Sequence, residues 1–199
     1  MQRLNLWVRG KRTEAGRVCS RFILSAVICF SAALHLSASG FSSEDAVKSP
    51  VPPRLSQDAA LKQIRSVYKA EYAKAEKRSK AAVAAKRALS EALLKAGVET
   101  GDDAVIAYSL FDESRLMAIA AGAVDLTLEA LSAMIQRYEF DPQDVQFESF
   151  QRLAQRVKSP DDSWAFSHAV RVVAQDCLGR DDFDSAEKFI KLVSRTAPR

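Results

Sequence analysis

Two side chains in the body of the chain have the chemistry of a nucleophile, a base or a metal ligand. Beyond residue 39, the sequence holds one histidine, His168, and one cysteine, Cys177. They lie nine residues apart on one expected helix, and at about 100° per residue their side chains point to opposite sides. They therefore cannot form a nucleophile–base pair within that helix, and they are too few for a zinc site. We predict a surface or structural role for His168.

Cys177 falls on the apolar side of the same expected helix, together with Val170 and Val173. A free cysteine in such a position usually behaves as a small buried hydrophobic residue. We therefore predict a buried Cys177, and a disulfide to another chain is the alternative for a lone thiol in an oxidising compartment.

The carboxylates that stand out occur as pairs, and each pair opens an expected helix: Asp102/Asp103, Asp161/Asp162 and Asp181/Asp182. Helix capping and the helix dipole explain these positions. The last pair continues to Asp184, but the run lacks the glycine and the bidentate glutamate of an EF-hand. Glycine-rich phosphate loops, dinucleotide fingerprints and nucleophile elbows are absent from the sequence. We predict a non-enzymatic protein without metal or cofactor; the alternative is an enzyme with an unrecognised carboxylate site.

The first 39 residues have the three-part pattern of a secretory signal. A basic segment is followed by an uncharged apolar stretch over 22–34 and by small residues at Ser37 and Ser39. The apolar stretch is shorter than the roughly 20 residues of a membrane span. We predict cleavage after Ser39 and a periplasmic or extracellular protein. The alternative is an uncleaved anchor, in which residues 22–38 tether an exported domain to the membrane.

The net charge of +4 belongs to this presequence. Residues 1–39 contain six Lys/Arg and one acidic residue, which leaves 23 basic and 24 acidic residues from residue 40 onward, a net charge of −1. We therefore predict no nucleic-acid partner.

The remainder divides into a linker over 40–55, rich in Ser and Pro, and a helical domain over 56–199. Apolar residues recur at three- and four-residue spacing through the domain, and Gly and Pro separate the stretches. We predict about seven helices: one from Ser56 with that serine as N-cap, then about 79–97, 103–121, 124–139, 142–157, 161–178 and 183–196. Gly97 and Gly122 are expected as C-caps, Asp161 or Asp162 as an N-cap, and 103–121 as the central helix.

The last two expected helices resemble a tetratricopeptide repeat. The residues Phe183-Asp184-x-Ala186 match its turn and its small crossing residue, and Pro198 matches its closing proline. The first of the two helices departs from the repeat, with Val170 in place of the usual Trp. Thr127 stands at the corresponding crossing of an earlier pair. The resemblance implies an all-α fold of antiparallel helix pairs in a right-handed TPR-like α-solenoid array, and it implies no particular ligand.

A second resemblance covers about residues 80–141. The pattern Leu89-x-x-Ala-Leu-Leu-x-Ala96, Thr100-x-Asp102-Asp103, Tyr108-x-Leu110 and Tyr138-x-x-Asp141 is similar to a helical segment of exported proteins of planctomycete-type bacteria. The resemblance implies export and a spacer or interaction role, and it supplies no catalytic residue.

Charge and hydrophobicity indicate two candidate surfaces. Residues 56–87 carry nine basic and three acidic residues, against 12 and 19 in 88–199. An anionic partner would contact the basic set, although a merely solvated face is the favoured interpretation. The basic candidates are Lys62, Arg65, Lys69, Lys74, Lys77, Arg78, Lys80, Lys86 and Arg87. The other candidate is an uncapped apolar end, with Phe183, Phe189, Ile190 and Val193 as the partner-contact face.

These features favour an exported interaction or scaffold module of the cell envelope. Its expected partner is a protein, with an anionic lipid or a wall polymer as alternatives. A membrane-tethered helical spacer is the second interpretation.

Overall fold

The computed structural model describes residues 48–196 except 78 and 102. The expected signal segment, residues 40–47 of the expected linker, Arg78 and Pro198 lie outside this range. Eight helices account for 81% of the described residues, and the strands among those residues are a single pair of two-residue segments. The all-α prediction is therefore confirmed. Among the described helices, none combines the length and hydrophobicity needed to span a membrane.

The folded part begins before Ser56. Strand β1 (Ser49–Pro50) pairs in parallel with β2 (Tyr138–Glu139), and α1 (Arg54–Val67) follows. The expected N-cap at Ser56 is wrong, because Pro53 precedes the helix and already accepts the Ser56 N–H. The Pro53 side chain cannot cap the helix. The side-chain amide of Gln57 instead donates a hydrogen bond to the backbone carbonyl of Pro52 at 2.7 Å. Residues 49–55 of the expected linker thus belong to the fold.

An eighth helix arises because the expected first helix is two helices. Helix α2 (Lys69–Ala75) is separated from α1 by Tyr68, whose backbone (φ −96°, ψ 25°) departs from helical geometry. Helix α3 (Lys80–Glu99) follows, capped by Ser79, whose hydroxyl accepts the Ala82 N–H. The Ile64 and Tyr72 side chains, on either side of the break, both pack against α3 and α4 in one apolar cluster.

The expected C-cap at Gly97 is also wrong, because α3 continues to Glu99. Gly97 lies inside the helix and is buried. A Cβ built there would lie 2.7 Å from Cε1 of Phe111, closer than real Cβ atoms approach other atoms. Because glycine has no Cβ, α3 can approach α4 closely enough to pack against the fully buried Phe111 ring.

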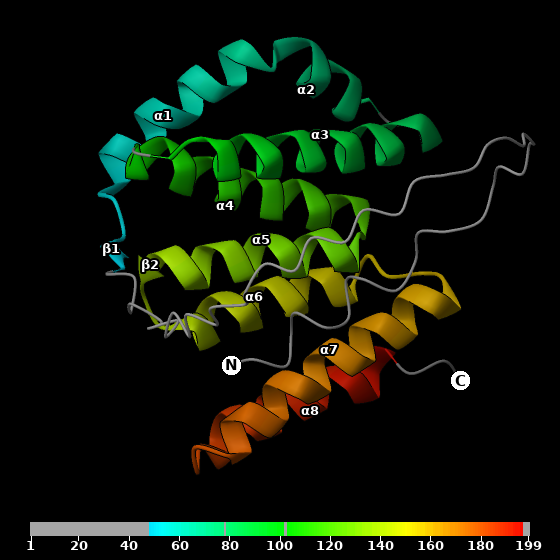
Figure 1. Ribbon diagram of the computed structural model, residues 1–199. Helices are drawn as coiled ribbons and strands as arrows, with labels where there is room; N and C mark the ends of the chain where they lie inside the picture. The colour runs from blue at the N-terminus through cyan, green and yellow to red at the C-terminus, as the bar shows by residue number, and fades with distance from the viewer. Residues whose placement is uncertain (1–47, 78, 102, 197–199) are drawn as a thin grey trace, which may run out of the picture. The chain divides into compact units, whose positions relative to one another are not determined.

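Helix α4 (Ala104–Ala121) has the central position that was expected. The Asp103 carboxylate accepts the Val105 and Ile106 N–H groups at 3.0 Å each, and Gly122 ends the helix in the left-handed region at φ 72°. The helix contacts α1, α3, α5 (Val124–Arg137) and α6 (Pro142–Ala154). In Figure 1, helices α3 to α6 lie beside one another in chain order.

Buried charged side chains distinguish α4 from the other described helices. Glu113, 3% exposed, accepts a hydrogen bond from the Tyr72 hydroxyl at 3.0 Å and is 3.4 Å from the Arg65 guanidinium. Arg115, 5% exposed, donates to the Ser149 hydroxyl of α6 at 2.8 Å and to Asp112. These bonds link α4 to α1, α2 and α6. A buried polar atom left without its partner is costly, so they favour one register of the helices.

The last helix pair is α7 (Pro160–Leu178) and α8 (Phe183–Thr196), joined by the turn 179–182. Neither Asp161 nor Asp162 is the N-cap of α7. Ser159 caps it, because its hydroxyl accepts the Asp162 N–H at 3.0 Å and Pro160 fills the first helical position. A turn of four residues requires the two helices to run antiparallel, and they lie side by side in Figure 1.

Candidate interaction surface

One side of the α7–α8 pair is packed against the rest of the domain by apolar side chains. Phe150 of α6 lies in edge-to-face contact with Phe166 of α7 at 6.0 Å and with Phe189 of α8 at 6.1 Å between ring centroids. All three rings are almost completely buried. At the tip, the Ser185 hydroxyl donates to the Gln143 side chain at 2.9 Å, which joins the start of α8 to the start of α6. The inner side of the pair is therefore fixed in place.

The opposite side, here called the outer face, carries large apolar side chains that remain exposed. Trp164 is 58% exposed, Leu178 43%, Phe183 64% and Ile190 51%. The four exposed large hydrophobic residues found elsewhere in the described chain are spread over α1 and α3, at Leu55, Val67, Val83 and Val98. Two of the four on α7 and α8, Leu178 and Ile190, line the same open groove. Exposed apolar side chains gathered at a groove are typical of an interaction site.

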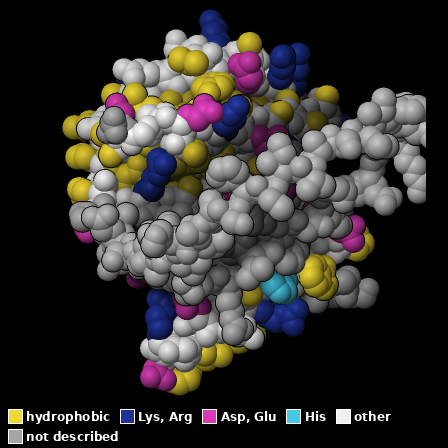
Figure 2. Space-filling model, in the orientation of Figure 1, with side chains coloured by type: hydrophobic (Ala, Val, Ile, Leu, Met, Phe, Trp, Pro, Cys, Tyr) yellow, Lys and Arg dark blue, Asp and Glu magenta, His cyan; other side chains and the backbone are white. Residues whose placement is uncertain are grey.

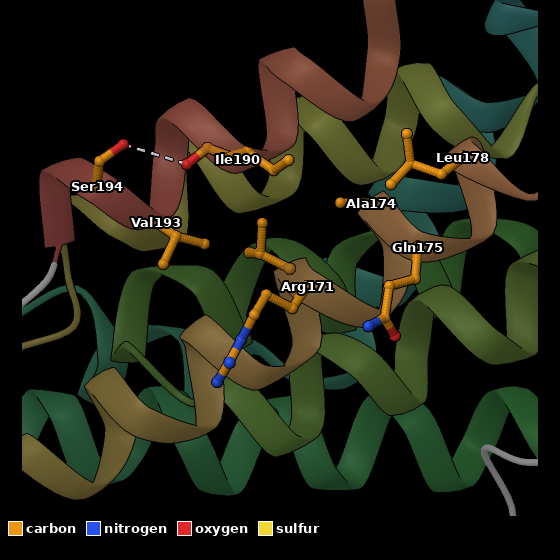
Figure 3. A pocket seen from close by; sticks show the side chains of 8 residues that line it. Arg171, Ala174, Gln175, Leu178, Ile190, Val193 and Ser194 are labelled. Atoms are coloured by element: carbon orange, nitrogen blue, oxygen red, sulfur yellow. Dashed lines mark hydrogen bonds between the residues drawn. The ribbon is translucent and has the colours of Figure 1, made fainter. Parts of the chain in front are cut away.

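The outer face contains an open groove between α7 and α8. The groove has a volume of about 430 Å³ and is lined by Val170, Arg171, Ala174, Gln175, Leu178, Ile190, Val193 and Ser194. Figure 3 shows the labelled residues of α7 on one side and those of α8 on the other. The polar ends of Arg171 and Gln175 point away from Ile190, so the floor of the groove is formed by small and aliphatic side chains.

The exposed side of α7 forms a line of residues at helical spacing: Trp164, His168, Arg171, Gln175 and Leu178. The Trp164 and His168 rings stack with centroids 5.5 Å apart and an interplanar angle of 23°. Exposed tryptophan and arginine are enriched where proteins bind other proteins. The line therefore joins the groove residues Arg171, Gln175 and Leu178 to the stacked rings of Trp164 and His168 near the start of α7.

The residues predicted for the partner-contact face fall into two groups. Phe183 and Ile190 lie on the outer face, and Val193 is a half-buried residue of the groove wall. Phe189 is 1% exposed and contacts Phe147 and Phe150, so it belongs to the core and not to this face. Sequence reasoning missed Trp164 and Leu178, although their 14-residue separation on α7 matches the helical period.

Eight of the nine predicted basic residues are described, on α1, α2, α3 and, for Lys77, between α2 and α3; they differ in whether they form salt bridges. Arg65 is held by Glu113, and Arg87 pairs with Asp125 of α5 and with Glu91. Six lysines take part in no salt bridge within the described residues: Lys62, Lys69, Lys74, Lys77, Lys80 and Lys86. On the face shown in Figure 2, basic side chains are separated by other side chains and form no continuous patch.

The residues first considered for chemistry occupy structural positions. Cys177 is fully buried, as predicted, and burial raises the pKa of its thiol, which keeps it protonated. Asp103 caps α4, and the Asp182 carboxylate accepts the Ser185 N–H at 3.1 Å, which lowers the pKa of that carboxyl. Within the described residues, no group of three or more His, Cys, Asp or Glu side chains is arranged to hold a metal ion.

No family model, curated protein or solved structure matches this chain.

Proposed function

We propose that this protein is an exported, non-enzymatic interaction or scaffold module of the cell envelope, and that it binds protein through the outer face of α7–α8. The observation that carries the proposal is the apolar groove of about 430 Å³ between two helices whose inner sides are already packed. A groove between antiparallel helices suits an amphipathic helix, whose apolar stripe fills the groove while its polar side stays in water. The predicted secretory signal supports the compartment.

The architecture proposed for this module is an array of antiparallel helix pairs similar to tetratricopeptide repeats. Two features of α7–α8 support it. Ala186, 1% exposed, stands in α8 where the repeat has a small residue at the helix crossing, and the four-residue turn gives the required antiparallel pairing. In such an array the next helix would lie against the outer face. A bound helix would occupy that position.

Site-specific photo-crosslinking tests the proposal. A photo-reactive amino acid replaces Ile190 in one strain and Val83 in another, because these two side chains are 51% and 50% exposed and lie on different helices. Illumination of intact cells of the host should join a protein to position 190 and not to position 83. The captured protein is then purified and its affinity for the wild-type chain and for Ile190→Asp is measured.

A loss of affinity of at least about tenfold in Ile190→Asp, with Val83→Asp unchanged, is the expected result. Crosslinks that form equally at both positions, or at neither, would contradict a protein-binding role for the outer face.

The six lysines of α1–α3 favour a second candidate, a membrane-tethered spacer whose basic helices lie near anionic lipid. Each exposed lysine near such a surface contributes about 1 kcal/mol of attraction. Sedimentation with vesicles containing about one third phosphatidylserine is expected to recover the protein if this role is correct, with uncharged vesicles as the control. A variant with Lys69, Lys74, Lys77 and Lys80 changed to Gln should then remain in solution.

A further inference from the structure

The outer face has the features that an interface between identical copies requires. An isologous contact needs projections and a cavity on the same patch, because the patch faces a copy of itself. Here Ile190 and Phe183 project from α8, and the groove with Val170 and Ala174 lies directly beside them. Accepting the proposed binding role of this face, we infer that its partner is a second copy of this chain.

Helix geometry specifies how two copies would fit. A two-fold axis parallel to the helices places α8 of each copy in the groove of the other, so that the two α8 helices run parallel and in contact. Rotation about that axis moves nothing along it, and Ile190 therefore lies level with Ile190 of the second copy. The register is fixed by symmetry.

The α7–α8 turn then sets the contacts between α8 and α7 of the second copy. Because α7 ends at Leu178 and α8 begins at Phe183, antiparallel helices with the same rise per residue place those two residues level with each other. Arg171 is level with Ile190 on the same grounds, and both line the groove. Phe183 of one copy thus meets Leu178 of the other, and two exposed apolar side chains cover each other.

The charges on the outer face agree with this arrangement. On the helical wheel of α8, Glu187 lies next to Ile190, on the side away from the buried Ala186 and Phe189, and in this arrangement that side faces α7 of the second copy. It falls within one turn of Arg171 there. Arg171 makes no salt bridge within the described residues, and Glu187 pairs only with Lys191 of its own helix at 2.7 Å. An acidic residue of each copy can therefore approach a basic residue of the other.

The area is sufficient for a modest dimer. Helix α8 has 14 residues and is about 21 Å long, and two packed helices present a width of about 20 Å. Each copy thus offers a flat area of about 400 Å². The two copies together, with the extra surface of their projecting side chains, would bury roughly 800–1,000 Å² in total. This total is below that of stable specific interfaces and falls in the range of weak, transient ones, so the dimer should form and dissociate with concentration.

Sedimentation velocity of the full chain, as it accumulates in the exporting host, tests the inference. Between about 1 and 200 µM the wild type should pass from monomer to dimer. Ile190→Asp should weaken the dimer at least about tenfold, whereas Val83→Asp, a charge placed at an equally exposed valine of α3, should leave it unchanged. Circular dichroism confirms that both variants remain folded.

A charge exchange identifies the contact itself. Arg171→Glu and Glu187→Lys should each weaken the dimer by about two- to fivefold at low salt, and the double variant should recover most of the loss. A wild type that stays monomeric at the highest concentration would overturn the inference, as would a dimer that persists in Ile190→Asp. If a different protein crosslinks to position 190 while the chain remains monomeric, only the proposed self-association fails.

Discussion

Two regions of the described domain, the surroundings of the central helix α4 and the terminal pair α7–α8, are stabilised by different interactions. Around α4, helices are joined by buried hydrogen bonds in addition to apolar packing: Glu113 accepts one from Tyr72, and Ser114 and Arg115 donate to α3 and α6. In α7–α8 the inner side is packed by phenylalanine rings, with one hydroxyl–amide bond at the tip, between Ser185 and Gln143. The first arrangement demands particular partners at particular positions. The second only needs apolar surface, and that surface continues around to the outer face.

This contrast explains where a partner would bind. A helix that satisfies buried polar groups on several sides, as α4 does, leaves no surface for another protein. A helix pair held by nondirectional apolar contacts on one side can accept the same kind of contact on the other. The predictions that follow separate the two kinds of stabilisation.

The largest effect is expected from Phe189→Ala. Removing a fully buried ring from the core of α6, α7 and α8 should lower the free energy of unfolding by about 3–5 kcal/mol. Phe183→Ala on the same helix removes a ring that is 64% exposed and should change it by less than about 0.5 kcal/mol. Urea unfolding followed by circular dichroism measures both. Equal effects of the two substitutions would mean that α8 is not held by its inner side.

Next in size is the loss of the buried carboxylate of α4. Glu113→Ala leaves the Tyr72 hydroxyl, on a side chain that is 7% exposed, without its acceptor and should cost about 2–3 kcal/mol of stability. Glu113→Gln retains a carbonyl oxygen for that bond and should cost about 1 kcal/mol or less. The same unfolding assay compares them. If the glutamine variant were as unstable as the alanine variant, the charge and not the hydrogen bond would be the important feature.

Gly97→Ala tests the close approach of α3 and α4. Alanine favours the helix, but its Cβ would lie 2.7 Å from the Phe111 ring, and the resulting overpacking should cost about 1–3 kcal/mol. Gly101→Ala is the matched control, since a Cβ there meets no atom within 4 Å. Thermal unfolding should show a lower melting temperature for the first variant only. A stabilised Gly97→Ala would show that the helices can separate at no cost.

The smallest effect concerns alkaline pH. Burial, together with the nearby Glu113 carboxylate, raises the pKa of Tyr72 well above its ordinary value of 10.0. The folded state therefore holds the Tyr72 hydroxyl proton more tightly than the unfolded state does. The resulting contribution to the free energy of unfolding is present below pH 10 and is lost as the pH rises further. Tyr72→Phe should therefore be less stable at neutral pH but lose stability less steeply above pH 10. Parallel slopes for the two proteins would argue against a buried Tyr72.

Much of the helical pattern could be predicted from the sequence because its signals are local. Asp103 and Gly122 act within one helical turn, so their residue types were sufficient. Gly97 was misassigned because a glycine near a helix end looks the same whether it terminates the helix or admits Phe111. The break at Tyr68 and the pairing of β1 with β2 depend on contacts between distant segments, which no local pattern specifies.

The candidate surface could be predicted only in part for a similar reason. The apolar residues of 183–193 cover a wide arc of α8, and the sequence does not tell which edge of that arc faces the core. Phe189 and Ile190 are neighbours in the chain, yet one is buried and the other half exposed. The position of α8 against α6, fixed by Phe147 and Phe150, decides between them.

The central claim is that the outer face of α7–α8 is covered by protein in the cell, and cysteine labelling tests it most directly. Cysteines replace Ile190 and Val83 in separate strains, and their reaction with a water-soluble maleimide is compared between intact cell envelopes and the dilute purified chain, with mass spectrometry to locate the label. The account expects Ile190→Cys to react at least about tenfold more slowly in the envelope, while Val83→Cys reacts equally in both. Equal reactivity of Ile190→Cys in the two preparations would contradict it.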